Sequence, residues 1–120
     1  MPDPTSKADC LFCKIRDGQI PATIVYRDER VLAFKDIGPK APLHDLVIPP
    51  DHVEALADAD ASHEGLLGHL MLVAARIARE SGLADKGFRV VMNSGVGAGQ
   101  TVFHVHLHVL AGRSFGWPPG

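Results

Sequence analysis

Three histidines near the end of the chain have the spacing of groups that can act together. His104, His106 and His108 alternate with Val105 and Leu107, which is the period of a β-strand whose rings share one face while the aliphatic side chains point into a core. Successive rings on such a strand lie roughly 6–7 Å apart. Because neighbouring cations disfavour one another, we expect at least one ring to be neutral and nucleophilic at neutral pH while another can carry a proton.

The histidine tract has two simpler interpretations. Its polar face could be merely solvated, or it could bind a metal, since two histidines at i and i+2 on a strand can ligate one ion. Three of the seven histidines fall within residues 104–108, which favours a functional cluster over chance. The spacing alone does not separate catalysis from metal binding.

A glycine-rich loop leads into the histidines. It runs from Asn93 to Gln100 and carries Gly95, Gly97 and Gly99. On its own it reads as a hairpin connection. Glycines also let backbone N–H groups approach an anion, as in phosphate-binding loops. A donor-rich loop before an imidazole face suggests chemistry at a phosphorus or acyl centre.

Residues 104–110, His-x-His-x-His followed by two apolar residues, resemble the signature of the histidine triad (HIT) superfamily. The resemblance covers almost the whole chain, through segments 11–15, 32–37 and 46–49, and the runs at 66–71 and 117–120 resemble the Hint branch, the nucleoside phosphoramidases. It implies an α+β fold: a five-stranded antiparallel sheet with one long helix and one or two short helices, in a homodimer.

The resemblance also implies an activity. The substrate would be a purine nucleoside 5′-monophosphoramidate of the adenylyl-lysine or AMP-amide type, and AMP, GMP or their derivatives would be the ligands. His106 would attack the α-phosphorus to give a nucleotidyl-histidine, from which water releases AMP. The strand pattern cannot choose among the three rings, so this role comes from the family. No cofactor is expected for catalysis.

Other site residues follow from the same resemblance. His44 would order the triad, His108 with the region of Gly99 and Thr101 would stabilise phosphate oxygens, and Asp36 would accept hydrogen bonds from the ribose. From propensity alone, Asp36 is more often a turn cap. Family members usually have Ser at the position of Thr101, whose added methyl could narrow access for the leaving group. The remaining nucleotide-binding candidates are Leu11, Phe12, Ile15, Ile37, Asn93 and Trp117.

Cys10 and Cys13 form a Cys-x-x-Cys pair. A disulfide, two free thiols and half of a zinc site are all compatible with it, whereas a thioredoxin-like motif would need a preceding strand. Many bacterial triad proteins hold zinc with two such cysteines, the histidine after the Ile-Pro strand and the first triad histidine. The resemblance therefore implies a closed structural zinc site of Cys10, Cys13, His52 and His104.

Hydrophobic spacing predicts the elements that must position these groups. Strands are expected near 24–26, 31–34, 44–48, 88–92 and 102–110, the last two paired through the glycine loop. A short helix is expected over 10–16, capped by Asp9 and closed by Gly18, and a long helix from 62–64 to Gly82. The apolar face of the long helix is wider than one sheet needs, which agrees with packing on a twin across a two-fold axis.

Length and composition limit the number of domains and the classes of protein to which the chain can belong. The 120 residues suit one domain, with a loose arm over 1–8 and a tail over 111–120. An apolar content of 46% and a net charge of −2 indicate neither disorder nor a nucleic-acid-binding surface. We recognise no signal peptide and no apolar run of membrane length, and so expect a cytoplasmic protein without a membrane partner.

Two other functions stay open. Cleavage of dinucleoside polyphosphates, as in the Fhit branch, would need a longer region after His108 than this sequence has. A non-catalytic nucleotide-binding or scaffold module would not need His106.

Overall fold

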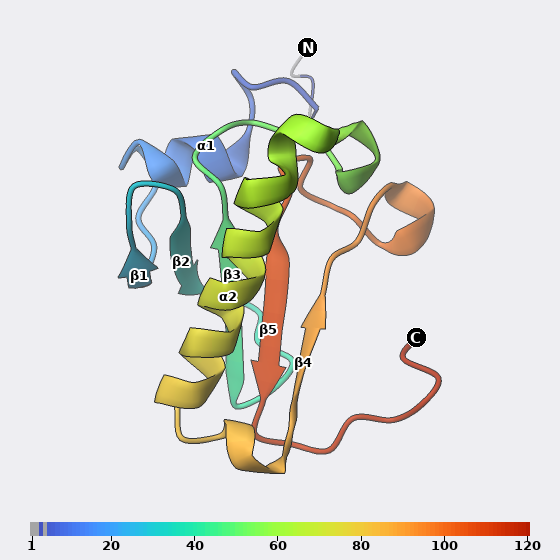
Figure 1. Ribbon diagram of the computed structural model, residues 1–120. Coiled ribbons are helices and arrows are strands. Elements are labelled where there is room, and N and C mark those ends of the chain that lie inside the picture. The colour runs from blue at the N-terminus through green and yellow to red at the C-terminus, as the bar shows by residue number, and fades with distance from the viewer. Residues whose placement is uncertain (1–2, 4) are drawn as a thin grey trace.

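A five-stranded antiparallel sheet forms the centre of the molecule (Figure 1). The computed structural model describes residue 3 and residues 5–120. Neighbouring strands follow the order β1-β2-β3-β5-β4, every pair antiparallel. This confirms the expected fold class and the pairing of the last two strands. The strands are β1 (Ile24–Arg27), β2 (Leu32–Lys35), β3 (Leu43–Ile48), β4 (Phe88–Val91) and β5 (Leu107–Ala111).

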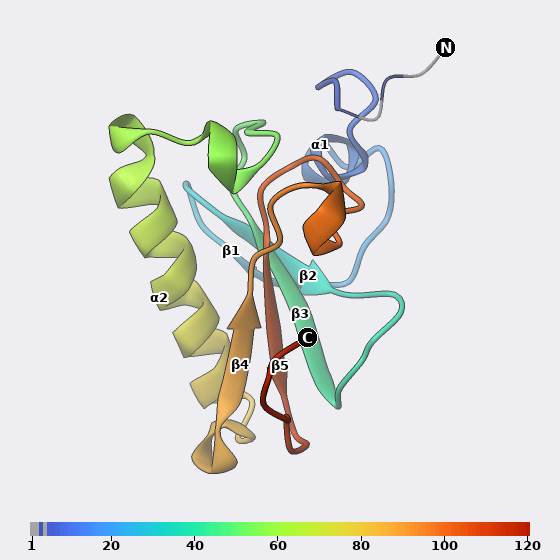
Figure 2. The same ribbon diagram turned by 90° about the vertical axis from the view of Figure 1, so that its right-hand side faces the viewer.

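Helices lie on both faces of this sheet. The long helix α2 (Glu64–Glu80) packs on β3 and β5, and Figure 2 shows the short helix α1 (Leu11–Arg16) on the opposite side. Four 3-10 turns connect the elements: η1 (Leu56–Asp58), η2 (Ala61–His63), η3 (Ala84–Lys86) and η4 (Val96–Ala98). In the described part of the chain, no helix has the length and apolarity needed to cross a membrane.

Alternation along β5 divides the interior into two cores. Val105, Leu107 and Val109 belong to the core under α2. The second core lies on the other face and contains Phe12 and Phe34, with both cysteines. Because side chains alternate across a strand, the even-numbered histidines face α1 rather than α2.

The strand expected over 102–110 is shorter in the structure, where β5 begins only at Leu107. The register of β3 and β5 pairs Val47 with Leu107, so the next positions on β3 lead to Pro49. A proline has no N–H to continue a ladder. The N–H of Val105 instead donates to the oxygen of Val53 over 2.7 Å, so this position bonds to the segment after Pro50 rather than to β3.

The start of α1 also differs from the expectation. The helix is capped by Cys10 rather than Asp9, because the Cys10 sulfur accepts from the N–H of Cys13 over 3.3 Å. The Asp9 carboxylate accepts from the N–H of Asp3 over 2.9 Å. Of the expected arm 1–8, residues 1, 2 and 4 lie outside the described residues. Gly18 follows the helix with a φ of 78°, as a helix-ending glycine does.

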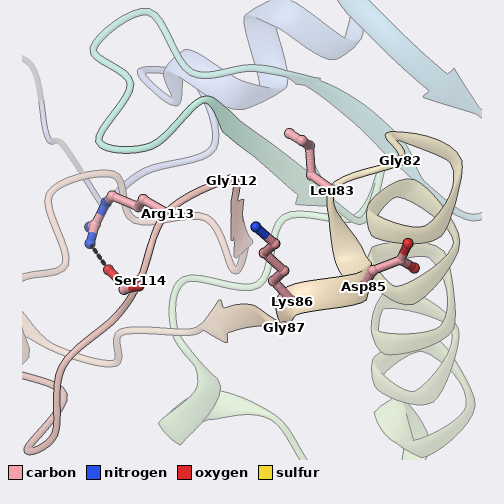
Figure 3. Close-up of a pocket in the computed structure, with 8 residues that line it drawn as sticks. All are labelled: Gly82, Leu83, Asp85, Lys86, Gly87, Gly112, Arg113 and Ser114. Carbon is pink, nitrogen blue, oxygen red and sulfur yellow. Dashed lines mark hydrogen bonds between the residues drawn. The ribbon is translucent and has the colours of Figure 1, made fainter.

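The turn after β5 connects the sheet to the tail at a crowded corner. A cavity of about 460 Å³ lies there. Figure 3 shows the residues that line it, which come from the region of η3 and from the residues that follow β5. Arg113 donates to the oxygen of Ser114 over 2.9 Å and to that of Lys40 over 2.8 Å. The first residues of the tail therefore hold the loop between β2 and β3.

Candidate active site

A cavity of about 330 Å³ lies between α1, β2 and the segment that leads into β5. Its lining is mainly apolar with a few polar side chains, as in sites for small organic ligands. The cavity brings together most of the expected nucleotide-binding and triad residues. Those expected are Leu11, Phe12, Ile15, Asp36, Ile37, Thr101, His106 and His108; those added include Ile20, Pro21, Ala22, Phe34, Leu46 and Val102.

A second, more open hollow of about 480 Å³ adjoins the first. The two share Asp36, Ile37 and His108, and the second adds His44 and Asn93. His108 and Asp36 therefore lie where the two hollows meet. An extended ligand lying across this boundary would contact both.

His106 presents one nitrogen to the cavity. Its ring is 6% exposed and packs edge-on against Phe12, with ring centres 5.0 Å apart. Its Nδ1–H donates to the backbone oxygen of His104 over 2.7 Å. Burial lowers the pKa of His106, although this hydrogen bond and the charge of Asp36 oppose the shift. The neutral ring then has its proton on Nδ1 and a lone pair on Nε2, which is the form needed for attack.

His44 and His108 form a hydrogen-bonded chain whose tautomers follow from its first donor. The N–H of Lys40 donates to His44 Nδ1 over 2.9 Å, so a neutral His44 carries its proton on Nε2. That nitrogen donates to His108 Nδ1, also over 2.9 Å. His108 must then carry its proton on Nε2. Burial, together with the charges of His106 and His44, lowers the pKa of His108 to about 4, and burial lowers the pKa of His44.

Asp36, His44 and His108 also have the separation of metal ligands. The carboxylate oxygen lies 3.4 Å from His44 Nε2. An ion would need a lone pair on that nitrogen, which carries the proton because Lys40 occupies Nδ1. The hydrogen-bonded chain therefore fits these groups better than a metal does.

The four expected zinc ligands converge on the far side of α1. The Nδ1 of His104 lies 3.3 Å from the Cys10 sulfur and 3.5 Å from the Cys13 sulfur, and the Nδ1 of His52 lies 3.5 Å from the Cys13 sulfur. All four donor atoms lie within 4.8 Å of one another. Tetrahedral zinc bonds to sulfur and nitrogen place such donors roughly 3.5 Å apart, so the chain's own geometry fits zinc.

Outer hydrogen bonds orient both imidazoles of this cluster. His104 Nε2 donates to the oxygen of Pro49 over 2.8 Å, and His52 Nε2 donates to that of Thr5 over 3.0 Å. Each bond leaves Nδ1 free to ligate. A metal-binding histidine usually has such a hydrogen bond on its other nitrogen, which orients the ring. Burial and the neighbouring Cys10 raise the pKa of Cys13 to about 11, so ligation would release thiol protons.

His104 corrects the expectation that three imidazoles face one substrate. Its ring is 0% exposed and points into the cysteine cluster. Only His106 and His108 line the cavity. The first triad histidine belongs to the cluster through its ring and to the active site through its backbone.

Two expected nucleotide-binding residues lie outside both hollows. Gly99 uses its N–H within the η4 turn, where it donates to Val96 over 3.0 Å, and has a φ of 95°. Trp117 is 86% exposed and contributes to neither hollow in the single chain. Asn93 lines the open hollow beside His108.

Sequence reasoning missed Lys40 and Gln100. Lys40 acts on His44 through its backbone N–H, which no side-chain pattern can reveal. Gln100 is buried, accepts from the N–H of Gly95 over 2.8 Å, and donates to Val102 over 3.1 Å. Its amide shapes the glycine loop. A glutamine directly after a glycine-rich run was the available signal.

Comparison with known sequences matches the model of the HIT domain to residues 17–115. An uncharacterised HIT-like protein of Synechococcus elongatus is 51% identical over 112 residues, 93% of this chain and 97% of that protein. A 14 kDa zinc-binding protein of Zea mays is 49% identical over 112 residues, 92% of this chain and 87% of that protein.

Solved structures give the same result. A HIT family hydrolase from Legionella pneumophila superposes with a TM-score of 0.90 at 47% identity, covering 92% of this chain and 99% of that one. A histidine triad protein from Clostridium difficile reaches a TM-score of 0.88 at 45% identity, covering 92% and 96% of the two chains.

Proposed function

This chain belongs to the HIT domain family, and from that membership we propose that it is a hydrolase of the Hint type that cleaves purine nucleoside 5′-monophosphoramidates. The observation that carries the proposal is the hydrogen bond from His106 Nδ1 to the His104 oxygen. It leaves an unprotonated Nε2 on a ring that lines a cavity sized for a small ligand. Structural relatives whose names include HIT family hydrolase support the reaction class.

The proposed reaction has two displacements at phosphorus. His106 Nε2 forms a bond to the α-phosphorus while the P–N bond breaks, and the leaving nitrogen departs as the amine after taking up a proton from solvent. Water then attacks the same phosphorus, breaks the bond to Nε2 and releases the nucleoside monophosphate. Burial in the cavity wall keeps His106 neutral, so its lone pair can attack without first losing a proton.

The cavity can hold a nucleotide in one orientation. Phe12 and the apolar wall around it suit a purine base, and Asp36 at the mouth suits the ribose hydroxyls. His108 Nε2–H and the Thr101 hydroxyl are the phosphate-facing donors. The N–H of Gly99 is already bonded within its turn, so we assign Gly99 a conformational role there.

We further propose that Cys10, Cys13, His52 and His104 hold a structural zinc ion. The donor geometry and the hydrogen bonds behind both imidazoles support it, as does the name of the maize relative. All four positions would be filled by protein atoms, which is the arrangement of a structural rather than a catalytic site. Elemental analysis should find about one zinc per chain, and a content near zero would reject the site.

We also propose that the protein is a homodimer. On the outer face of α2, Met71 is 51% and Leu72 is 70% exposed, although large aliphatic side chains usually lie in contact with others. The tail of one chain would place Trp117 near the partner's cavity. An exposed tryptophan gains from such a contact.

His106→Ala tests the proposed function. It should lower turnover of an adenosine phosphoramidate by at least about 10⁴-fold, as loss of a covalent nucleophile does, while AMP affinity measured by calorimetry stays within a few-fold. Diadenosine polyphosphate serves as the competing substrate. Unchanged turnover in the variant, or preference of the wild type for the dinucleotide, would remove the proposal.

A further inference from the structure

His104 belongs to two sites at once. Its ring lies among the thiols of Cys10 and Cys13, at 3.3 and 3.5 Å. Its backbone oxygen, in the same residue, accepts the 2.7 Å hydrogen bond from His106 Nδ1. The ring is entirely buried, so it can turn only if the groups packed around it, or the backbone that holds His106, move.

We propose that the Cys10–Cys13–His52–His104 cluster positions the active-site nucleophile: ligation of the His104 ring fixes the carbonyl that sets the tautomer and direction of His106. This rests on the role proposed above for His106. His104 is then a positioning residue, because it acts on the reaction only through its neighbour.

The cluster reaches the cavity by a second route through α1. Cys10 caps this helix and Cys13 lies within it, while Phe12 and Ile15 from the same helix line the cavity. The Phe12 ring packs against His106 at 5.0 Å and against His104 at 6.1 Å. A six-residue helix is not stable alone, so its docking depends on what holds its first turn.

Without an ion, the remaining contacts hold His104 less firmly. Its Nε2 still has the oxygen of Pro49 and the next residue still has that of Val53. On the cluster side, however, its Nδ1 faces only thiols, whose S–H groups are weak donors. The His104 ring then has one strong contact, the hydrogen bond to Pro49, in place of two. The His104 carbonyl that accepts from His106 therefore becomes more mobile.

The experiment compares chelator-stripped protein with the same protein reloaded with zinc, using ¹⁵N NMR of the histidine rings. Reloaded protein should show His106 as one tautomer, protonated on Nδ1, and stripped protein should show a mixture. Turnover of an adenosine phosphoramidate should fall about 100-fold on stripping, the cost of misplacing a reacting group by about 1 Å, and AMP affinity should fall as α1 loosens.

Two variants separate positioning from general stability. Cys13→Ser removes one ligand and should reproduce the mixed tautomers without a chelator. Val73→Ala, in the core under α2, should lower the melting temperature but leave the His106 spectrum intact. If stripping unfolds the sheet, the Cys13→Ser spectrum decides.

Identical His106 spectra in stripped, reloaded and Cys13→Ser protein would overturn the inference, as would a reloaded protein that binds no zinc. The ring spectrum does not depend on turnover. If no phosphoramidate is cleaved by reloaded protein, the proposed function fails while the coupling of cluster and His106 is still decided.

Discussion

At the scale of single residues, hydrogen bonds rather than charges determine the tautomer of each histidine and so the role it can take in the reaction. From sequence, at least one ring was expected to be neutral and nucleophilic while another can carry a proton. Burial lowers the pKa of His44, His106 and His108 alike. Their roles differ because Lys40 sets the tautomer of His44 and the His104 oxygen sets that of His106. One neutral ring can attack while another donates.

The hydrogen-bonded chain predicts the effect of His44→Phe, which keeps a ring but removes both nitrogens. His108 then loses the donor that keeps its proton on Nε2, and kcat/KM should fall about 10- to 100-fold, less than the roughly 10²–10³ for deleting an oxyanion donor. The matched control is His69→Phe on α2. The His69 ring lies outside both hollows and makes a 2.7 Å hydrogen bond to Asp28. Equal kcat/KM in His44→Phe and wild type would argue against the chain.

The lowered pKa values also predict a pH dependence of stability. Between the ordinary value of 6.5 and about 4, the unfolded chain protonates His108 while the folded chain does not. The unfolded state then binds more protons, so the free energy of unfolding should fall as pH drops through that window and be unaffected by this group above it. In His108→Asn the slope of the free energy of unfolding against pH should be smaller than in wild type by up to about 1.4 kcal/mol per pH unit within this window. Urea denaturation at several pH values measures it, and parallel slopes would contradict the prediction.

At the scale of elements, alternation and turn residues predicted all five strands and both helices to within a few residues. The error came in the stretch before β5, because strand period alone does not show that its partner positions would be Pro49 and Pro50. That register appears only once Val47 pairs with Leu107. Sequence also could not show that Cys10 caps α1 through its own sulfur, since thiols are not usual capping groups.

Gly112 tests the packing of the corner drawn in Figure 3. Its φ is 95°, and an added Cβ would lie 2.8 Å from Pro42 Cβ and 3.2 Å from Leu83 Cδ1. Positive φ and overpacking together should make Gly112→Ala cost about 2–4 kcal/mol of unfolding free energy. Gly97→Ala is the control, because nothing lies within 4 Å of its Cβ position and its φ is not positive. Similar denaturation midpoints for the two variants would show that the corner is loosely packed.

At the scale of the whole molecule, the sheet separates two functions. The face under α2 is a core that carries the proposed dimer surface on its outside, and the other face carries the cluster, α1 and the cavity. All four residues of the cluster and about half of those that line the cavity were named from sequence, because the family motif fixes their positions. What the motif could not show was that the first histidine faces the cluster with its ring and the cavity only through its backbone.

The proposed dimer predicts that Leu72→Glu dissociates the protein. A carboxylate placed on the exposed apolar face of α2 would have to be buried between two chains without a partner, which is costly. Sedimentation should give a mass of two chains for wild type and one chain for the variant, with Glu29→Lys in the exposed β1–β2 turn as the control. A wild type that sediments as one chain rejects the dimer.

The central claim is that His106 becomes covalently linked to the nucleotide. Reactions with an adenosine phosphoramidate test it most directly when they are quenched in alkaline denaturant, because the P–N bond to histidine is acid-labile, and are then digested and read by mass spectrometry. The account predicts an adenylyl group on His106 that appears before AMP and is missing in His106→Ala. Release of AMP by wild type with no adduct at any time, or an adduct on His108, would contradict it.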